Sequence, residues 1–341
     1  MSKRYARQEL FYGIGKEGQK KLREKSVVLV GCGALGCTSA NLLVRSGIKR
    51  LKIIDRDYIE ESNLQRQSLF DEDDIKENLP KAVAAQRKLQ KIDPDVSISY
   101  DVADLNPSNI ETLLENFHIV IDGTDNFETR FLINDFCVKK QIPWIYGACI
   151  GSVGLTMNII TPKTPCLRCI LEEVPPIGSS ETCDTAGIIA PIACCIASIQ
   201  VAEALKILTD DFDSMSKCLL IIDLWRNETK KLRVDTIKEK SDCIVCKHRR
   251  FEFLNSNKHS MTTSVCGRNS IQILPHNGAK INLTELASRL KKIGSVSYNS
   301  YLLRFKIDRY ELSVFPDGRS IISGTNDAPT AKGLFTKYIG I

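Results

Sequence analysis

Short apolar runs alternate with segments of helical periodicity along the first part of the chain. The runs are mostly apolar, as expected of strands buried in a parallel sheet, and they cover residues 26–30, 51–54, 96–100 and 118–121. Segments with apolar residues at helical spacing lie between them, at residues 36–46, 81–91 and 110–115. The short connections between strand and helix predict an α/β fold, with a doubly wound, mostly parallel, Rossmann-like sheet and flanking helices.

The second part of the chain predicts further strands and a separate small module. Later strands are expected at residues 142–146, 155–160, 219–223 and 231–234, the last of them antiparallel. A polar stretch predicts a linker at 251–263, which divides a larger domain (1–250) from a small α+β C-terminal module (264–341). The module is expected to contain helices at 283–290 and 329–338 and strands at 301–307, 311–315 and 320–322.

Composition narrows the class of protein. The 341 residues are 43% hydrophobic and 26% charged, with a net charge of +6, which is ordinary for a globular protein. The run Lys247-His248-Arg249-Arg250 is too short to indicate nucleic-acid binding, so we interpret it as a solvated loop or helix end, with partner docking as the alternative. The apolar segment 186–202 contains Pro191 and is shorter than the ~20 residues of a membrane-spanning helix, so it predicts a buried helix and no membrane partner.

Cysteine usage indicates both a compartment and a metal. Thirteen cysteines and a polar first segment without an apolar core predict a cytoplasmic protein, in which thiols bind metals or react instead of forming disulfides. Cys166-Leu-Arg-Cys169 and Cys243-Ile-Val-Cys246 are two C-x-x-C pairs, which together supply four thiolates for a tetrahedral structural Zn²⁺. Redox activity of either pair and unrelated buried thiols are the alternatives.

A glycine-rich turn follows the first predicted strand. Gly31-Cys32-Gly33-Ala34-Leu35-Gly36 has the pattern of a loop whose backbone approaches a phosphate at the N-terminus of a helix. Asp55 ends the next strand and is placed to accept hydrogen bonds from ribose hydroxyls. These features predict a nucleotide site, but a dinucleotide dehydrogenase would show them too, and a tight turn without a ligand is the remaining alternative.

Three charged residues distinguish between nucleotides. Arg66 and Lys81 follow the second strand, and Asp125 follows the fourth. Attack at the α-phosphorus of ATP places negative charge on its oxygens and on the departing pyrophosphate, which fixed cations and a Mg²⁺ held by an aspartate stabilise. Hydride transfer to a nicotinamide develops little charge there. These residues therefore favour nucleotidyl transfer over an NAD-dependent oxidoreductase.

The motifs occur in the order found in one family. The family is ThiF/MoeB/HesA, the prokaryotic relatives of ubiquitin-activating enzymes, and the chain looks closest to its ThiF-like members. The resemblance covers about residues 3–248 and rests on Arg4-Tyr-Ala-Arg7-Gln8, the glycine loop, Asp55, Ser62-Asn-Leu-Gln-Arg-Gln67, Lys81 and Asp122-Gly-Thr-Asp-Asn126. One departure is Ala34, which stands where some members have a glycine.

The resemblance implies the parts of an ATP site. By analogy, the glycine loop (Gly31 to Gly36) and Asp55 would bind the adenosine and ribose, with Gly33 and Ala34 in contact. The residues that would contact the phosphates and position Mg²⁺ are Asn63, Arg66, Lys81, Asp125 and its neighbour Asn126. Arg7 resembles the arginine that these proteins lend to the ATP of the second subunit, which implies a homodimer. The resemblance also places structural zinc at the four paired cysteines.

Cys183 is a candidate nucleophile. It lies shortly before the predicted buried helix, whose dipole favours a thiolate, although Asp184 opposes this effect. The residues alone leave a reactive and an incidental role open, and the resemblance aligns Cys183 with the cysteine that forms a covalent adduct with the carrier. Cys266 is expected to be a strand residue, with a reactive thiol as the alternative. The cysteines expected to pack in the core are Cys32, Cys37, Cys137, Cys149, Cys194, Cys195 and Cys218.

The resemblance also implies an activity and partners. It implies ATP-dependent adenylation of the C-terminal Gly-Gly carboxylate of a ubiquitin-like sulfur-carrier protein, ThiS-like or MoaD-like. Thiamine thiazole synthesis, molybdopterin synthesis and tRNA thiolation remain open as pathways. The tail has no rhodanese cysteine loop, so a separate sulfur donor is expected. An NAD-dependent oxidoreductase and a non-catalytic carrier-binding scaffold are the alternatives.

Overall fold

The computed structural model describes residues 3–175, 182–255, 262–264, 269–274 and 280–340. Contacts divide the chain into two compact units. The first unit comprises Met1–Glu72 and Lys81–Ser256, and the second comprises Asp73–Pro80 and Asn257–Ile341. The predicted linker at 251–263 stays a prediction. Its first residues belong to the first unit, in which Phe251 is buried and Phe253 N donates to Asp135 Oδ2.

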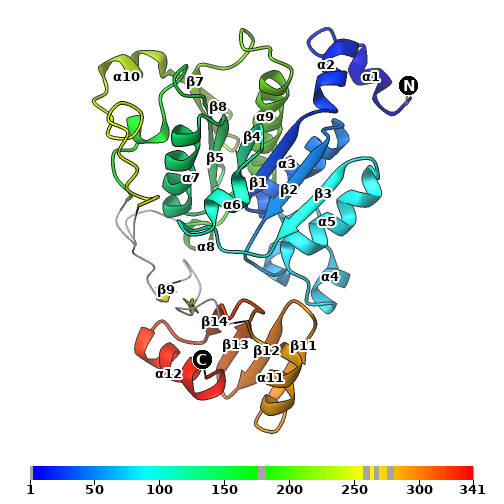
Figure 1. The fold of residues 1–341 in the computed structure, drawn as a ribbon, viewed down its shortest axis with the longest axis vertical. Coiled ribbons are helices and arrows are strands. Elements are labelled where there is room, and N and C mark those ends of the chain that lie inside the picture. Colours follow the sequence, from blue (N-terminus) through cyan, green and yellow to red (C-terminus); the bar gives the residue numbers. More distant parts are fainter. Residues whose placement is uncertain (1–2, 176–181, 256–261, 265–268, 275–279, 341) are drawn as a thin grey trace. The chain divides into compact units, whose positions relative to one another are not determined.

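An eight-stranded sheet forms the centre of the first unit, in the order β3-β2-β1-β4-β5-β6-β7-β8 (Figure 1). Strands β1 to β5 pair in parallel, whereas β5 to β8 pair antiparallel. The strands are β1 (Ser26–Val30), β2 (Arg50–Ile54), β3 (Ser97–Asp101), β4 (Ile119–Asp122), β5 (Trp144–Ile150), β6 (Val153–Ile159), β7 (Cys218–Asp223) and β8 (Glu228–Arg233). The predicted mostly parallel, doubly wound sheet is confirmed.

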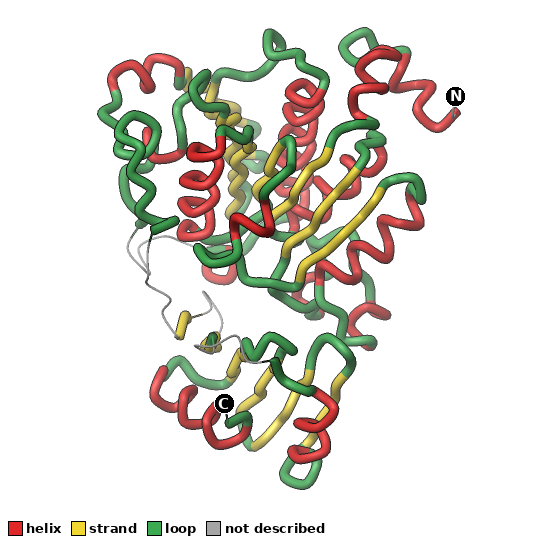
Figure 2. The backbone as a smooth tube through the Cα atoms, in the orientation of Figure 1, coloured by secondary structure: helices red, strands yellow, loops and turns green. Residues whose placement is uncertain are grey.

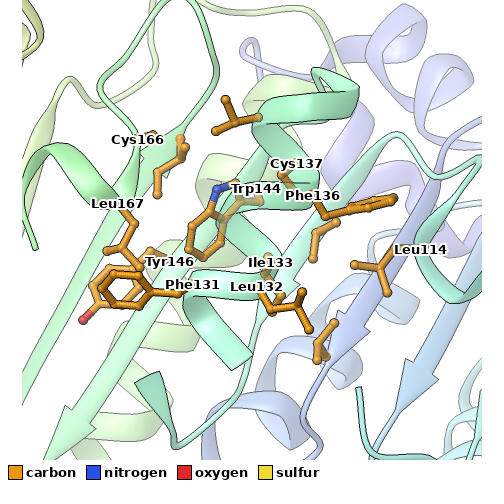
Figure 3. Close-up of a cluster of buried hydrophobic side chains, with 14 of the residues drawn as sticks. Leu114, Phe131, Leu132, Ile133, Phe136, Cys137, Trp144, Tyr146, Cys166 and Leu167 are labelled. Carbon is orange, nitrogen blue, oxygen red and sulfur yellow. The ribbon is translucent and has the colours of Figure 1, made fainter. Parts of the chain in front are cut away.

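Helices cover the sheet in two groups, as Figure 2 shows. One group consists of α3 (Ala34–Arg45), α5 (Lys81–Ile92) and α9 (Ala190–Leu208), and the other of α6 (Ile110–Leu114) and α7 (Phe127–Lys140). The shorter helices are α1 (Ala6–Glu9), α2 (Gly15–Leu22), α8 (Cys183–Ala186) and α10 (Asp235–Lys240). One part of the core lies between α7 and the sheet, where Phe131, Phe136 and Trp144 are buried (Figure 3).

The apolar segment predicted as one helix is divided in the structure. Gly187, at φ +73°, ends α8, and α9 begins at Ala190 with Pro191 in its first turn. Among the described helices, α9 alone is long and apolar enough to span a membrane by length and composition. It packs on α3, β5 and β6, which is the position of a core helix.

The second unit is an antiparallel sheet with two helices on one face. Its strand order is β11-β12-β13-β14-β10-β9, and apolar residues such as Phe305, Leu312 and Ile322 pack against the helices. The elements are α4 (Glu72–Lys76), β9 (Thr262–Ser264), β10 (Ser270–Ile273), α11 (Leu283–Leu290), β11 (Ser295–Tyr298), β12 (Leu303–Ile307), β13 (Tyr310–Val314), β14 (Ser320–Ser323) and α12 (Ala328–Tyr338). Three of these strands, β9, β10 and β11, were not predicted.

Candidate functional site

Three of the predicted nucleotide-site residues follow the ends of three neighbouring strands. Gly31 follows β1, Asp55 follows β2, and Asp125 comes three residues after β4. Strands β2, β1 and β4 are adjacent and parallel, so their carboxyl ends lie at one edge of the sheet. Open α/β sheets bind ligands at this edge.

The glycine loop is packed directly against the end of β4. Gly31 has φ +87°, a left-handed conformation, and a Cβ there would lie 2.5 Å from Gly123 O. A Cβ on Gly36 would lie 2.1 Å from Gly31 O. Gly33 differs, since the nearest atom to its Cβ position is Gln67 Nε2 at 3.9 Å, and it precedes α3, which begins at Ala34. The loop therefore presents the N-terminus of α3 for an anion.

Asp55 joins the loop to the end of β2. Its Oδ2 accepts from Cys32 N at 2.6 Å and its Oδ1 from Asp57 N at 2.7 Å. Burial raises the pKa of this carboxyl, while the nearby Lys81 acts in the opposite direction. Each carboxylate oxygen retains a second lone pair, so the predicted contact with ribose is compatible with this arrangement.

Lys81 is a buried cation at the first position of α5. Its side chain is 5% exposed, and Nζ lies 3.2 Å from Asp57 Oδ2. The backbone N–H of Lys81 donates to Asp57 O at 2.9 Å. The backbone and the side chain of Lys81 thus both bind Asp57 in the segment after β2. The ammonium group is close enough to Asp55 to oppose the rise in the pKa of its carboxyl that burial causes.

Arg56 is a site cation that the sequence analysis did not single out. Its Nη1 lies 3.1 Å from Asp104 Oδ1. Burial lowers the pKa of the guanidinium, but Asp104, Asp57 and then Asp125 more than offset this, so the pKa is raised. Asp125 also contributes to the raised pKa of Arg130. The charge of Asp125 therefore raises the pKa of an arginine that follows β2 and of an arginine in the helix that follows β4. In the sequence, the position of Arg56 directly after Asp55 was the signal that could have identified it.

Asn63 and Gln67 carry buried polar atoms that lack partners. Asn63 Oδ1 accepts from Glu60 N at 3.1 Å, whereas Asn63 Nδ2 and Gln67 Oε1 have no hydrogen-bond partner in the described part of the chain. Both side chains are at most 3% exposed. Buried polar atoms are almost always paired, so these two atoms are available to a ligand or a water molecule. Gln67 belonged to the recognised motif but received no predicted role.

Arg66 is held on its own turn. Its Nη1 donates to Ser62 O at 2.8 Å, and the residue is half-buried. The structure therefore places Arg66 in the segment beside Asn63, although its guanidinium is engaged locally. Its predicted contact with phosphate stays a prediction.

A buried ion pair fixes the loop that carries Asp125. Arg130 Nε lies 3.2 Å from Asp122 Oδ2, and Arg130 Nη2 donates to Thr124 O at 2.6 Å. Asp125 itself is exposed. Asn126 caps α7, with Oδ1 accepting from Thr129 N at 2.8 Å, so its side chain has a structural use whatever its role towards a nucleotide.

Arg7 lies outside this group of residues. It is exposed on α1, and it is followed by Leu10, Phe11 and Tyr12, which are 74%, 53% and 94% exposed. Three consecutive large apolar side chains on a surface are typical of an interaction site.

The two C-x-x-C pairs converge. The sulfur of Cys166 lies 3.8 Å from that of Cys169 and 3.5 Å from that of Cys243, and Cys169 Sγ lies 3.4 Å from Cys246 Sγ. All four sulfurs lie within 4.8 Å of one another. Tetrahedral zinc with bonds of about 2.3 Å places its sulfurs roughly 3.8 Å apart. The cluster can therefore hold a metal ion.

Helix α7 supports the segments that carry these cysteines. Leu167 N donates to Asn134 Oδ1 at 2.8 Å, next to Cys166. After the second pair, Arg249 Nη1 donates to Val138 O at 3.1 Å and Phe253 N to Asp135 Oδ2 at 2.9 Å. Arg249, which belongs to the basic run at residues 247–250, therefore binds the backbone of α7.

Cys183 is the first residue of α8, and Thr182 caps this helix. The chain after α8 is attached to the turn between β5 and β6, because Gly151 N donates to Gly187 O at 2.8 Å and Ile189 N to Gly151 O at 3.0 Å. The side chain of Cys183 and all of Cys266 lie outside the described residues.

The other cysteines were all predicted to pack in the core. Cys32, Cys37 and Cys137 are buried as predicted. Cys149 and Cys195 are partly buried and pack against a core cluster, which agrees with the prediction. Cys194 and Cys218 are only partly buried.

Similar proteins agree with the resemblance seen in the motifs. The chain is 45% identical to the sulfur carrier protein ThiS adenylyltransferase of Bacillus subtilis, over the whole of both chains. It is 34% identical to the SAMP-activating enzyme E1 of Haloferax volcanii, over 71% of this chain and 88% of that protein. Among solved structures, E. coli MccB with ATP matches with a TM-score of 0.61 and 25% identity, over 69% of this chain and 72% of that one. The ThiF family model matches residues 5–248, and this chain belongs to the ThiF family.

Proposed function

We propose that this chain uses ATP to adenylate the C-terminal carboxylate of a ubiquitin-like sulfur-carrier protein and releases pyrophosphate. The observation that carries the proposal is the group of residues at the carboxyl ends of β1, β2 and β4. There the uncapped start of α3, the buried ammonium of Lys81 and the unpaired Asn63 Nδ2 lie together with acidic residues. Identity of 45% along the whole chain to an enzyme named for ThiS supports a ThiS-like carrier and thiamine thiazole synthesis.

The residues at this edge would divide the work of nucleotidyl transfer. The N–H groups at Gly33 and Ala34 would donate hydrogen bonds to a phosphate, and Asp55 would accept a hydrogen bond from a ribose hydroxyl. Lys81 and Arg66 would stabilise charge on the α-phosphate and the departing pyrophosphate. A C-terminal carboxylate is already ionised at neutral pH, so no general base is needed.

Asp125 would hold Mg²⁺, which screens the phosphate oxygens from the attacking carboxylate. Its exposed side chain suits a ligand for a metal that arrives with ATP. The four cysteines would hold Zn²⁺, which would stabilise the fold without taking part in the reaction, since four sulfur ligands leave no open position.

The functional form is a homodimer in the cytoplasm. The exposed residues Leu10, Phe11 and Tyr12 would be covered by a second copy, which would bring the neighbouring Arg7 to the ATP of the other subunit. Sulfur would come from a separate donor. Cys183 would form a covalent adduct with the carrier after adenylation.

Exchange of labelled pyrophosphate into ATP, dependent on a ThiS-like carrier ending in Gly-Gly, tests the reaction. Asp125→Ala and Arg66→Ala should abolish exchange, whereas Asp213→Ala, at an exposed aspartate in the same unit, should not. Near-normal exchange in both site variants would contradict the assignment. Calorimetric titration with ATP and with NAD separates this reading from an oxidoreductase, because only ATP should bind.

Cys183→Ser gives a separate test of the carrier adduct. The variant should keep pyrophosphate exchange and lose any covalent carrier–enzyme species detected by mass spectrometry. Loss of exchange itself would mean that Cys183 acts in adenylation.

A further inference from the structure

Asn299 lies in the turn between β11 and β12 and uses its whole amide group. Its Oδ1 accepts from Tyr301 N at 2.8 Å and from Leu302 N at 2.9 Å. Its Nδ2 donates to Glu77 O at 2.9 Å and to Asn78 O at 3.0 Å. A primary amide offers two donor hydrogens and one acceptor oxygen with two lone pairs, so this side chain is fully satisfied. The amide of Asn299 thus stabilises its own turn and also binds the backbone of residues 77 and 78, which are distant in sequence.

Asn299 binds residues of Asp73–Pro80, a short segment that belongs to the second unit although it lies far from the rest of that unit in the sequence. Residues 73–80 contain most of α4, after which the chain reverses at Asn78 with φ +51°. Leu79 N donates back to Asp74 O at 3.1 Å, and both residues are buried. The reversal is therefore fixed by a hydrogen bond to α4 within the segment and by the hydrogen bonds from Asn299.

This segment leads directly into Lys81. Only Leu79 and Pro80 separate the carbonyl of Asn78 from Lys81, whose own N–H donates to Asp57 O. Two residues span at most about 7 Å even when extended, and proline restricts the backbone further. The Asn78 turn is therefore tied by a short link to the first turn of α5, where the buried ammonium of Lys81 pairs with Asp57.

We propose that Asn299 is a positioning residue for Lys81, and that the turn between β11 and β12 serves the nucleotide site by holding the segment that leads into Lys81. This inference rests on the proposed function, because it takes Lys81 as a phosphate ligand. It gives the C-terminal part of the chain a role in ATP binding that does not require it to touch ATP.

Asn299→Asp is the sharpest test. A carboxylate keeps an acceptor for the N–H groups of Tyr301 and Leu302 but places a second negative oxygen against the carbonyls of Glu77 and Asn78. Loss of two hydrogen bonds should raise the KM for ATP roughly fivefold to twentyfold, with a smaller change in kcat. Amide hydrogen exchange at residues 77–81 should become faster. Should this variant fail to fold, Asn299→Ser, which shortens the side chain, should change both quantities in the same direction.

Asn282→Ala provides a matched control in the same unit. Asn282 caps α11 by accepting from Thr284 N and Glu285 N, so its removal weakens the second unit without touching residues 77–78. The control should keep the KM for ATP and the exchange at 77–81. Wild-type values in Asn299→Asp, or an equal rise of KM in Asn282→Ala, would overturn the inference. Failure of the proposed function would show differently, as absence of carrier-dependent exchange in the unsubstituted protein.

Discussion

Replacing Arg130 by methionine should strongly destabilise the first unit. The guanidinium of Arg130 lies 3.2 Å from Asp122 Oδ2 and also donates to the carbonyl oxygens of Thr124 and Gly147, at 2.6 and 3.1 Å. The side chains of the ion pair are 5% and 0% exposed. Methionine fills much of the space but leaves the carboxylate of Asp122 buried without its cation. Removal of one partner of a buried pair costs about 3–5 kcal/mol of unfolding free energy.

A second substitution separates the cost of the isolated charge from the loss of packing. Arg130→Met with Asp122→Asn leaves no charge behind, while an amide oxygen can still accept from Thr124 N, as Asp122 Oδ1 does at 2.9 Å. The double variant should therefore recover about half or more of the lost stability, because most of the cost comes from the uncompensated charge.

Urea unfolding followed by tryptophan emission is a suitable assay. Trp144 is fully buried in the adjacent core (Figure 3), whereas Trp225 is 78% exposed already and should change little. A loss of less than about 1 kcal/mol in Arg130→Met, or a double variant no more stable than the single one, would refute this account of the ion pair.

Three further predictions concern pH, metal and the glycine loop. Burial raises the pKa of Asp135 to about 7, so the folded chain holds a proton that the unfolded chain releases near pH ~4. Relative to Asp135→Asn, the wild-type protein should lose about 2–3 kcal/mol of stability from about pH 5 to about pH 8 in urea titrations, and parallel curves would contradict this. Cys243→Ser should remove bound zinc measured by mass spectrometry and lower the thermal midpoint, and retention of one zinc per chain would exclude the four-sulfur site. Gly36→Ala should abolish ATP binding in calorimetry, since its Cβ would lie 2.1 Å from Gly31 O, and unchanged binding would count against that steric argument.

The parallel part of the sheet was predictable because its signal is local. Residues 26–30 are all buried in β1, and a strand covered on both faces is rich in apolar residues, as Val27 to Val30 are here. The glycine loop was predictable for a related reason, since Gly31 and Gly36 occupy positions where a Cβ would collide with backbone. Spacing also anticipated the convergence of Cys166 and Cys243, although they are far apart in sequence.

Features that depend on distant partners were not predictable. Nothing in the sequence around Asn299 indicates that its amide binds the backbone of Glu77, because any polar turn residue looks the same. The strand β11 reads Ser-Val-Ser-Tyr and lacks a clear apolar run, so pairing with β12 is what defines it. The position of Arg56 directly after Asp55 was visible in the sequence, but its ion pair with Asp104 depends on the tertiary structure.

The close approach of the turns after β1 and β4 limits the positions at which mutations could alter nucleotide specificity. Gly31 and Gly123 face each other so closely that a Cβ on either would lie within 2.5 Å of the other's carbonyl oxygen. Mutation at either position would force the two turns apart, whatever side chain it introduced. Gly33 has room for a side chain, and the nearest atom to it is Gln67 Nε2. We therefore expect substitutions that alter nucleotide selectivity to be tolerated at Gly33 and Gln67, and these two positions are the ones to vary in a mutant library.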